Sequence, residues 1–320
     1  MQSGLFRSVG VAGILVVFAG CDLVELATPA RFHEDFDYSY PLASGGRLAV
    51  ENTNGSIEVA AWDQETVRIE GTKFASSKEL LDLLEIDVVP AEDFLQIRTV
   101  KPSGRWGAAG ARYRIHVPAA VAVDPLITTN GSVSVKGVTG PVRARTSNGR
   151  VEIEKVAGAV EVRTSNGSIT CTEIDGDAKL TTSNGAIRVT GLKGRLRART
   201  SNGSVKARLV PGPGVEPIEV RTSNGSVTLV LERAPASDVI VATSNASITV
   251  YAPESLKAQL RLKSTNATVS TDFDVAASGE HSKHRLEGAV NGGGPLVQLT
   301  TTNGTIRLLK LKPGDQSAEL

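Results

Sequence analysis

The tetrapeptide Thr146-Ser147-Asn148-Gly149 recurs with small variations along most of the chain and sets its period. Aligned on the asparagine, five copies stand 18 residues apart, three more follow at steps of 22, 21 and 21, and a last copy follows after 37. An early copy stands apart near the start. A fixed period near 20 residues is the signature of stacked structural units. The ten asparagines are Asn54, Asn130, Asn148, Asn166, Asn184, Asn202, Asn224, Asn245, Asn266 and Asn303.

Apolar residues alternate on both sides of each asparagine. Three residues after it stands Val or Ile in all ten copies, and in the 18-residue units a further apolar residue and a glycine, such as Val156 and Gly158, follow. Before it, pairs such as Val160 and Val162 alternate with polar residues. Alternation of this kind predicts half-buried strands. Each unit is therefore expected to contain two strands separated by two corners.

Asn-Gly between alternating runs is also typical of a β-hairpin. Hairpins would place unlike residues side by side, whereas here each column repeats the same residue type, as in-register parallel stacking requires. The sequence therefore predicts an all-β, right-handed parallel β-solenoid of 18- to 22-residue coils, each strand lying on its equivalent in the next coil. The asparagine side chains are expected to form a ladder. The Asn-Gly corners are expected to use left-handed backbone conformations.

Residues 1–21 resemble a bacterial lipoprotein-type signal segment. An apolar run over 9–18, too short to span a bilayer, ends in Phe18-Ala19-Gly20-Cys21. The resemblance implies a diacylglycerol on Cys21 and a membrane-anchored lipoprotein in the cell envelope, facing the periplasm or the exterior. Cleavage by an ordinary signal peptidase, or retention as an anchor, are the alternatives.

The other expected divisions are a linker over 22–44, an N-terminal β-rich cap over 45–124, the repeat solenoid over 125–311 and a polar tail over 312–320. Strands are predicted over 67–72, 86–89, 95–98 and 112–117. Ser76 and Glu79 have capping-box spacing before a leucine-rich run, which predicts one short helix in the cap. The last coil, 296–311, is expected to close the stack after an insert over 273–295.

The run Gly46–Val59, the short helix between strands, Val117-Pro118 and the Thr-Ser-Asn-Gly array resemble the bacterial putative-adhesin family of β-strand-repeat proteins, a domain family of unknown function. The resemblance covers roughly 45–311. It implies the fold and supplies no catalytic residues, cofactor or substrate.

Little in the sequence points to catalysis. Cys171 falls in a predicted core column without a base beside it, and His281 and His284 lie in a polar insert, for which a solvated loop is favoured over a metal site. Outward positions carry no acid pair of the kind that hydrolyses polysaccharide. A net charge of +1 implies no bulk attraction to nucleic acid. We expect no enzyme activity, cofactor or metal.

Charge does gather at the outward positions three and five residues before the asparagine. In the copies from Asn130 on, nine cations stand there against Glu161 and Glu219, whereas the outward positions after the asparagine are nearly balanced. This candidate face predicts binding of an anionic glycan, a phosphate polymer or headgroups, with a merely solvated face as the alternative. A self-associating envelope scaffold and a polysaccharide-active β-helix enzyme also stay open, as does the choice between a monomer and end-to-end association. The nine are Arg143, Arg145, Arg163, Lys179, Arg197, Arg199, Arg221, Arg261 and Lys263.

Overall fold

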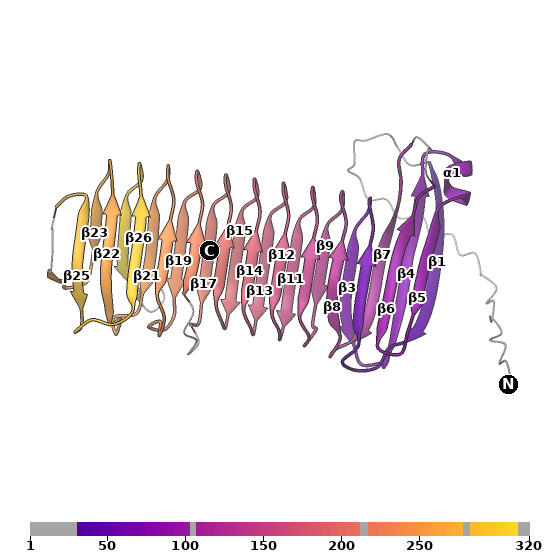
Figure 1. Ribbon diagram of the computed structural model, residues 1–320, viewed down its shortest axis with the longest axis horizontal. Coiled ribbons are helices and arrows are strands. Elements are labelled where there is room, and N and C mark those ends of the chain that lie inside the picture. The colour runs from indigo at the N-terminus through magenta and orange to yellow at the C-terminus, as the bar shows by residue number, and fades with distance from the viewer. Residues whose placement is uncertain (1–30, 103–106, 212–216, 278–281, 313–320) are drawn as a thin grey trace, which may run out of the picture.

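The computed structural model describes residues 31–102, 107–211, 217–277 and 282–312. These residues form two long sheets of 13 and 14 strands, called sheet A and sheet B here. The sheets run along the whole molecule, with the N-terminal elements gathered at one end (Figure 1). Neighbouring coils pair their strands in parallel, as in the partners β11 and β13 or β12 and β14. The predicted parallel β-solenoid is confirmed.

Each coil contributes one strand to each sheet, and the strand after the asparagine belongs to sheet A. The coil strands of sheet A are β3 (Ile57–Trp62), β7 (Ala109–Pro118), β9 (Val133–Lys136), β11 (Val151–Val156), β13 (Ile169–Ile174), β15 (Ile187–Leu192), β17 (Val205–Leu209), β19 (Val227–Leu231), β21 (Ile248–Ala252), β23 (Val269–Thr271) and β27 (Ile306–Lys310). Those of sheet B are β2 (Arg47–Glu51), β6 (Phe94–Val100), β8 (Ala122–Ile127), β10 (Val142–Arg145), β12 (Val160–Arg163), β14 (Ala178–Thr181), β16 (Leu196–Arg199), β18 (Ile218–Arg221), β20 (Val239–Ala242), β22 (Ala258–Ser264) and β26 (Leu296–Thr301).

The core is a thin layer of aliphatic side chains between the sheets. Val151 lies opposite Ile169, Ile169 opposite Ile187, and Ile187 opposite Val205, in the register that the repeat predicts. All four are at most 1% exposed. Because each inward column repeats one residue type, every coil buries its apolar face against two equivalent neighbours.

The asparagine corner is held by two hydrogen-bonded columns. Every asparagine but Asn54 donates its side-chain amide to the asparagine oxygen of the neighbouring coil on the N-terminal side of the stack, for example Asn184 Nδ2 to Asn166 Oδ1 at 2.7 Å. The ladder runs unbroken through all ten copies. The threonine two residues earlier is buried. Thr182 Oγ1 donates to the Gly167 carbonyl oxygen at 2.9 Å and accepts from the Gly185 N–H at 3.2 Å. The expected asparagine ladder is present.

The expected left-handed corner is wrong for most coils. Of the described corner glycines that follow an asparagine, only Gly55 has a positive φ, of 117°. Glycine is favoured instead by close approach, since a Cβ on Gly167 would lie 1.7 Å from the Gly149 carbonyl oxygen. Ala246 and Ala267 stand at this place in two coils, so the corner can shift to admit a methyl group.

The N-terminal cap adds antiparallel strands to the end coil. β4 (Thr66–Ala75) pairs with β7, β1 (Phe32–Pro41) pairs with β4, and β5 (Glu85–Pro90) pairs with β6. The linker expected over 22–44 is therefore wrong for residues 32–41, which form a strand. That strand is the outer edge of sheet A and carries Glu34, Asp35 and Asp37, and charges of this kind discourage further edge pairing.

One short helix lies in the cap, as predicted. Helix α1 spans Lys78–Asp82, and its N-cap is Ser77, whose Oγ accepts from the Leu80 N–H at 3.2 Å. The capping box predicted at Ser76 and Glu79 is therefore one residue out of register, because Ser77 occupies the extended conformation that a cap requires.

The coils are not stacked in sequence order at either end. The coil β2–β3 lies between β6–β7 and β8–β9, and the last coil, β26–β27, lies between β20–β21 and β22–β23 (Figure 1). Asn303 accordingly stands between Asn245 and Asn266 in the ladder. The expectation that the last coil closes the stack is wrong. The end of sheet B is formed instead by β25 (Arg285–Val290), antiparallel to β22, and β24 (Ala276–Ala277).

Candidate anion-binding face

The outward side chains of sheet B form two columns that run across the coils. The basic column holds the residues three before each asparagine from Asn148 on and continues onto β25: Arg145, Arg163, Thr181, Arg199, Arg221, Ala242, Thr300, Lys263 and Arg285, in spatial order. The mixed column holds the residues five before it: Arg143, Glu161, Lys179, Arg197, Glu219, Ile240, Gln298, Arg261 and Glu287. Alternation along each strand points both columns away from the core.

The acids of the mixed column form ion pairs with cations of both columns. Glu161 accepts from Lys179 at 3.0 Å, and Arg143 lies 3.2 Å from Asp124 and 3.6 Å from Glu161. Hydrogen bonds from Lys179 and Arg163 hold the pKa of the Glu161 carboxyl below its ordinary value, although partial burial opposes the shift. The carboxylate is therefore charged at neutral pH, and this column presents an ion-pair ladder to solvent.

The basic column contains no acidic residue among its members. Its cations are exposed, with Arg163 and Arg199 side chains at 56% and 51%. Arg145 lies directly opposite Arg163, and Arg199 lies opposite Arg221. Like charges on neighbouring strands destabilise a sheet unless solvent or a ligand compensates them. The column is thus a row of cations beside the asparagine corner, interrupted by Thr181, Ala242 and Thr300.

The structure divides the nine predicted cations between the two columns. Four of them are in the mixed column (Arg143, Lys179, Arg197, Arg261) and five in the basic column (Arg145, Arg163, Arg199, Arg221, Lys263). Sequence reasoning missed Arg285, because β25 lies in the insert after the eighth regular copy and pairs antiparallel. No repeat signal marks its register.

A shallow groove of about 320 Å³ lies over sheet B beside the mixed column. Val142, Val160 and Ala178 form part of its lining, together with Arg143, Glu161, Lys179 and the ion-paired Asp177 and Arg195. Hydrogen bonds from Arg195 lower the pKa of Asp177. The groove therefore balances acids against bases, and its charge contrasts with that of the neighbouring basic column.

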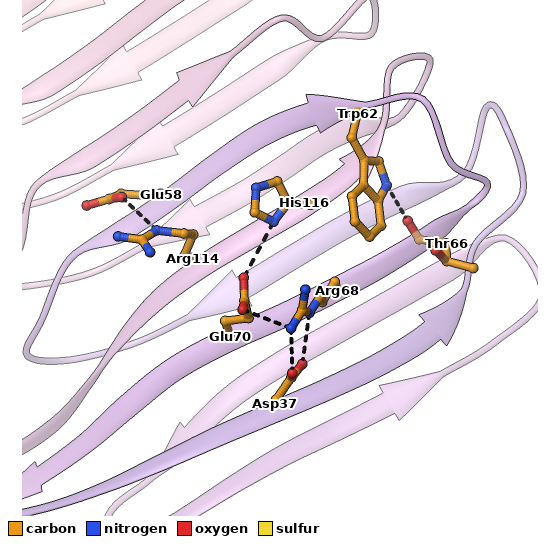
Figure 2. A network of polar contacts seen from close by, with 8 residues as sticks. All are labelled: Asp37, Glu58, Trp62, Thr66, Arg68, Glu70, Arg114 and His116. Carbon is orange, nitrogen blue, oxygen red and sulfur yellow. Dashed lines mark hydrogen bonds and ion pairs between the residues drawn. The ribbon is translucent and has the colours of Figure 1, made fainter. Parts of the chain in front are cut away.

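The outer face of sheet A at the N-terminal end is also balanced (Figure 2). Arg68 lies 2.8 Å from Asp37 and 3.1 Å from Glu70, and Glu70 faces His116 at 3.8 Å. Arg114 faces Glu58 at 3.8 Å. Trp62 stacks on His116 and donates its indole N–H to the Thr66 carbonyl oxygen at 2.8 Å. Each cation of this network has an acid beside it.

Cysteine and histidine side chains are the other candidates for chemistry in this chain. Cys171 is fully buried and its burial raises the pKa of the thiol to about 12. In the described ranges no group of three or more His, Cys, Asp and Glu side chains could hold a metal ion. His284 Nδ1 lies 2.8 Å from the Ala267 carbonyl oxygen, whereas His281 and Cys21 fall outside the described residues. No helix of the described residues is long and apolar enough to cross a bilayer.

A family model described as Toastrack DUF4097 matches residues 125–309. Among solved structures, the chain is similar to a putative adhesin from Bacteroides fragilis and to a putative lipid binding protein from Parabacteroides distasonis. For each, identity is 11%, 87% of this chain and 97% of the other are covered, and the TM-score is 0.44. A putative adhesin from Parabacteroides merdae has 9% identity, covers 88% and 96%, and has a TM-score of 0.38. No curated protein matches significantly.

Proposed function

The chain belongs to the Toastrack DUF4097 family, and we propose that it is a non-enzymatic, adhesin-like lipoprotein of the cell envelope whose basic column binds anionic polymers or headgroups. One observation carries this proposal. Between β10 and β25 the outward acids of sheet B all lie in the mixed column, so the parallel basic column presents cations and neutral residues but no acid. The net charge of the protein would not produce this binding, since the whole chain carries only +1.

The arrangement has an energetic cost that a ligand would remove. Neighbouring strands stand about 4.8 Å apart, and two unit charges at such a distance repel by roughly 1 kcal/mol even in water. Guanidinium groups form bidentate hydrogen bonds with phosphate and carboxylate. A bound polyanion would replace repulsion between Arg145 and Arg163, and between Arg199 and Arg221, with attraction.

Charge reversal on the basic column tests the proposal. Changing Arg145, Arg163, Arg199 and Arg221 to glutamate together is expected to abolish retention on heparin and on anionic liposomes. For the wild-type protein, retention on heparin but not on liposomes would assign the ligand to soluble polymers. Retention on liposomes but not on heparin would assign it to headgroups. Melting temperature checks that the variant folds.

The matched control reverses four cations on the outer face of sheet A: Arg188, Lys206, Arg208 and Arg307. It changes the net charge by the same amount but leaves the basic column intact, so most retention should persist. Equal loss in both variants, or no retention of the wild type at low salt, would contradict the proposal.

The lipid anchor is a separate part of the proposal and rests on the segment Phe18-Ala19-Gly20-Cys21. The mature protein is expected to begin at Cys21, to carry a diacylglycerol there and to sediment with membranes. Cys21→Ser should leave a precursor or a soluble form. Intact-mass analysis decides the matter, and an unmodified Cys21 or cleavage elsewhere would remove the anchor.

A further inference from the structure

We propose that the basic column binds a linear phosphate or sulfate polymer at three discrete stations separated by neutral coils. This inference rests on the proposed function and deepens it. Each station is a pair of cations on neighbouring strands together with one glutamate of the mixed column. Station one is Arg145, Arg163 and Glu161, station two is Arg199, Arg221 and Glu219, and station three is Lys263, Arg285 and Glu287.

The three stations share one internal design. In each, the glutamate holds the terminal nitrogen Nη2 of one arginine: Arg163 to Glu161 at 3.0 Å, Arg199 to Glu219 at 3.1 Å, and Arg285 to Glu287 at 2.9 Å. These glutamate side chains are only 12–29% exposed. The carboxylate therefore fixes one guanidinium in place, and it is a positioning residue for the anion that the pair would receive.

The second cation of each station has no such anchor. Within the described ranges, Arg145, Arg221 and Lys263 have no acidic side chain within ion-pair distance. Each lies directly opposite its anchored partner on the neighbouring strand. One anchored and one free cation, about 4.8 Å apart at the backbone, can converge on a single phosphate or sulfate group.

Neutral residues separate the stations. Thr181 lies between the first and second, and Ala242 and Thr300 lie between the second and third. The second gap is two coils wide only because β26 is inserted between β20 and β22. At about 4.8 Å per coil, station centres are about 14 Å and about 19 Å apart, and about 33 Å from first to last.

These distances favour a flexible linear polymer over a flat anionic surface. The basic column is one residue wide, and the acids of the mixed column flank it along one side. A membrane plane would meet those acids together with the cations. A single chain can follow the column, and binding at one station raises its effective concentration at the next.

The test is affinity for linear polyphosphate of graded length, measured by calorimetry on the full chain. Tripolyphosphate reaches one station, a longer chain reaches two, and chains that extend past about 33 Å reach all three. Affinity is expected to rise in steps of about tenfold or more at each length that first reaches another station. In the first-station variant R145E/R163E, one of the two steps in affinity should disappear and the other should remain.

A second variant fills the neutral gap between the first two stations and keeps every cation in place. Thr181→Arg joins the first two stations into an unbroken row and should convert the step between them into a smooth rise with length. A smooth rise in the wild type, indistinguishable from that variant, would overturn the stations while leaving the proposed function intact. Absence of binding at every length would also overturn the stations, whereas the proposed function is decided separately by retention on heparin and anionic liposomes.

Discussion

The inward and outward columns of the solenoid are built from the same strands, but they depend differently on the order of the coils. Inward columns are apolar in nearly every coil, so Val205, which lies opposite Ile187, would meet an apolar residue on almost any other coil. Outward columns differ from coil to coil. The charge that surrounds Arg221 or Lys263 is set by which coil lies next to it.

This difference teaches that a repeat sequence determines its core more robustly than its surface. The coil β26–β27, inserted between β20–β21 and β22–β23, contributes apolar residues such as Ile306 and Leu308 to the core columns. The same insertion adds Thr300 and Gln298 to the outer columns and widens a neutral gap. The repeat alone therefore predicts the core. The composition of the outer columns can be stated only when the spatial order of the coils is known.

The largest expected effect is on the inward side. Val205→Asp places a carboxylate at a position that is 0% exposed, among aliphatic side chains that cannot compensate the lost hydration. We expect it to lower the free energy of unfolding by about 3–5 kcal/mol. Thermal unfolding measures the change.

The neighbouring residue supplies the control for that substitution. Lys206 points outward from the same strand, so Lys206→Asp should change the stability by about 0.5 kcal/mol or less. Equal melting temperatures for the two variants would show that inward and outward columns do not differ as the register requires.

Most of the fold could be predicted because period, alternation and corner chemistry agree. The ten aligned asparagines and the β-branched residue three places later determine strand, corner and parallel register. The cap strands are also visible as alternating runs. What could not be predicted is spatial order, since Asn54 and Asn130 are neighbours although 76 residues separate them. The edge strand 32–41 lacked a strong pattern because its outward and inward residues are both largely exposed.

The candidate face could be predicted as a set of cations but not as two columns of different character. Positions three and five residues before the asparagine both point outward, and the sequence shows that Glu161 and Glu219 lie in only one of these positions. Which cations those acids neutralise depends on cross-strand distances. Arg285 could not be found, because its strand pairs antiparallel outside the repeat.

The central claim, that the basic column and not the overall charge binds polyanions, is tested most directly by moving cations without changing net charge. The variant replaces Arg145, Arg163, Arg199 and Arg221 with threonine, and Gln64, Ala91, Thr139 and Ala236 with arginine. These four exposed residues lie in four separate loops, so the moved cations form no column. Binding to heparin is measured at several salt concentrations. We predict that affinity falls by about tenfold or more, because the column is lost. Unchanged affinity at every salt concentration would contradict the claim.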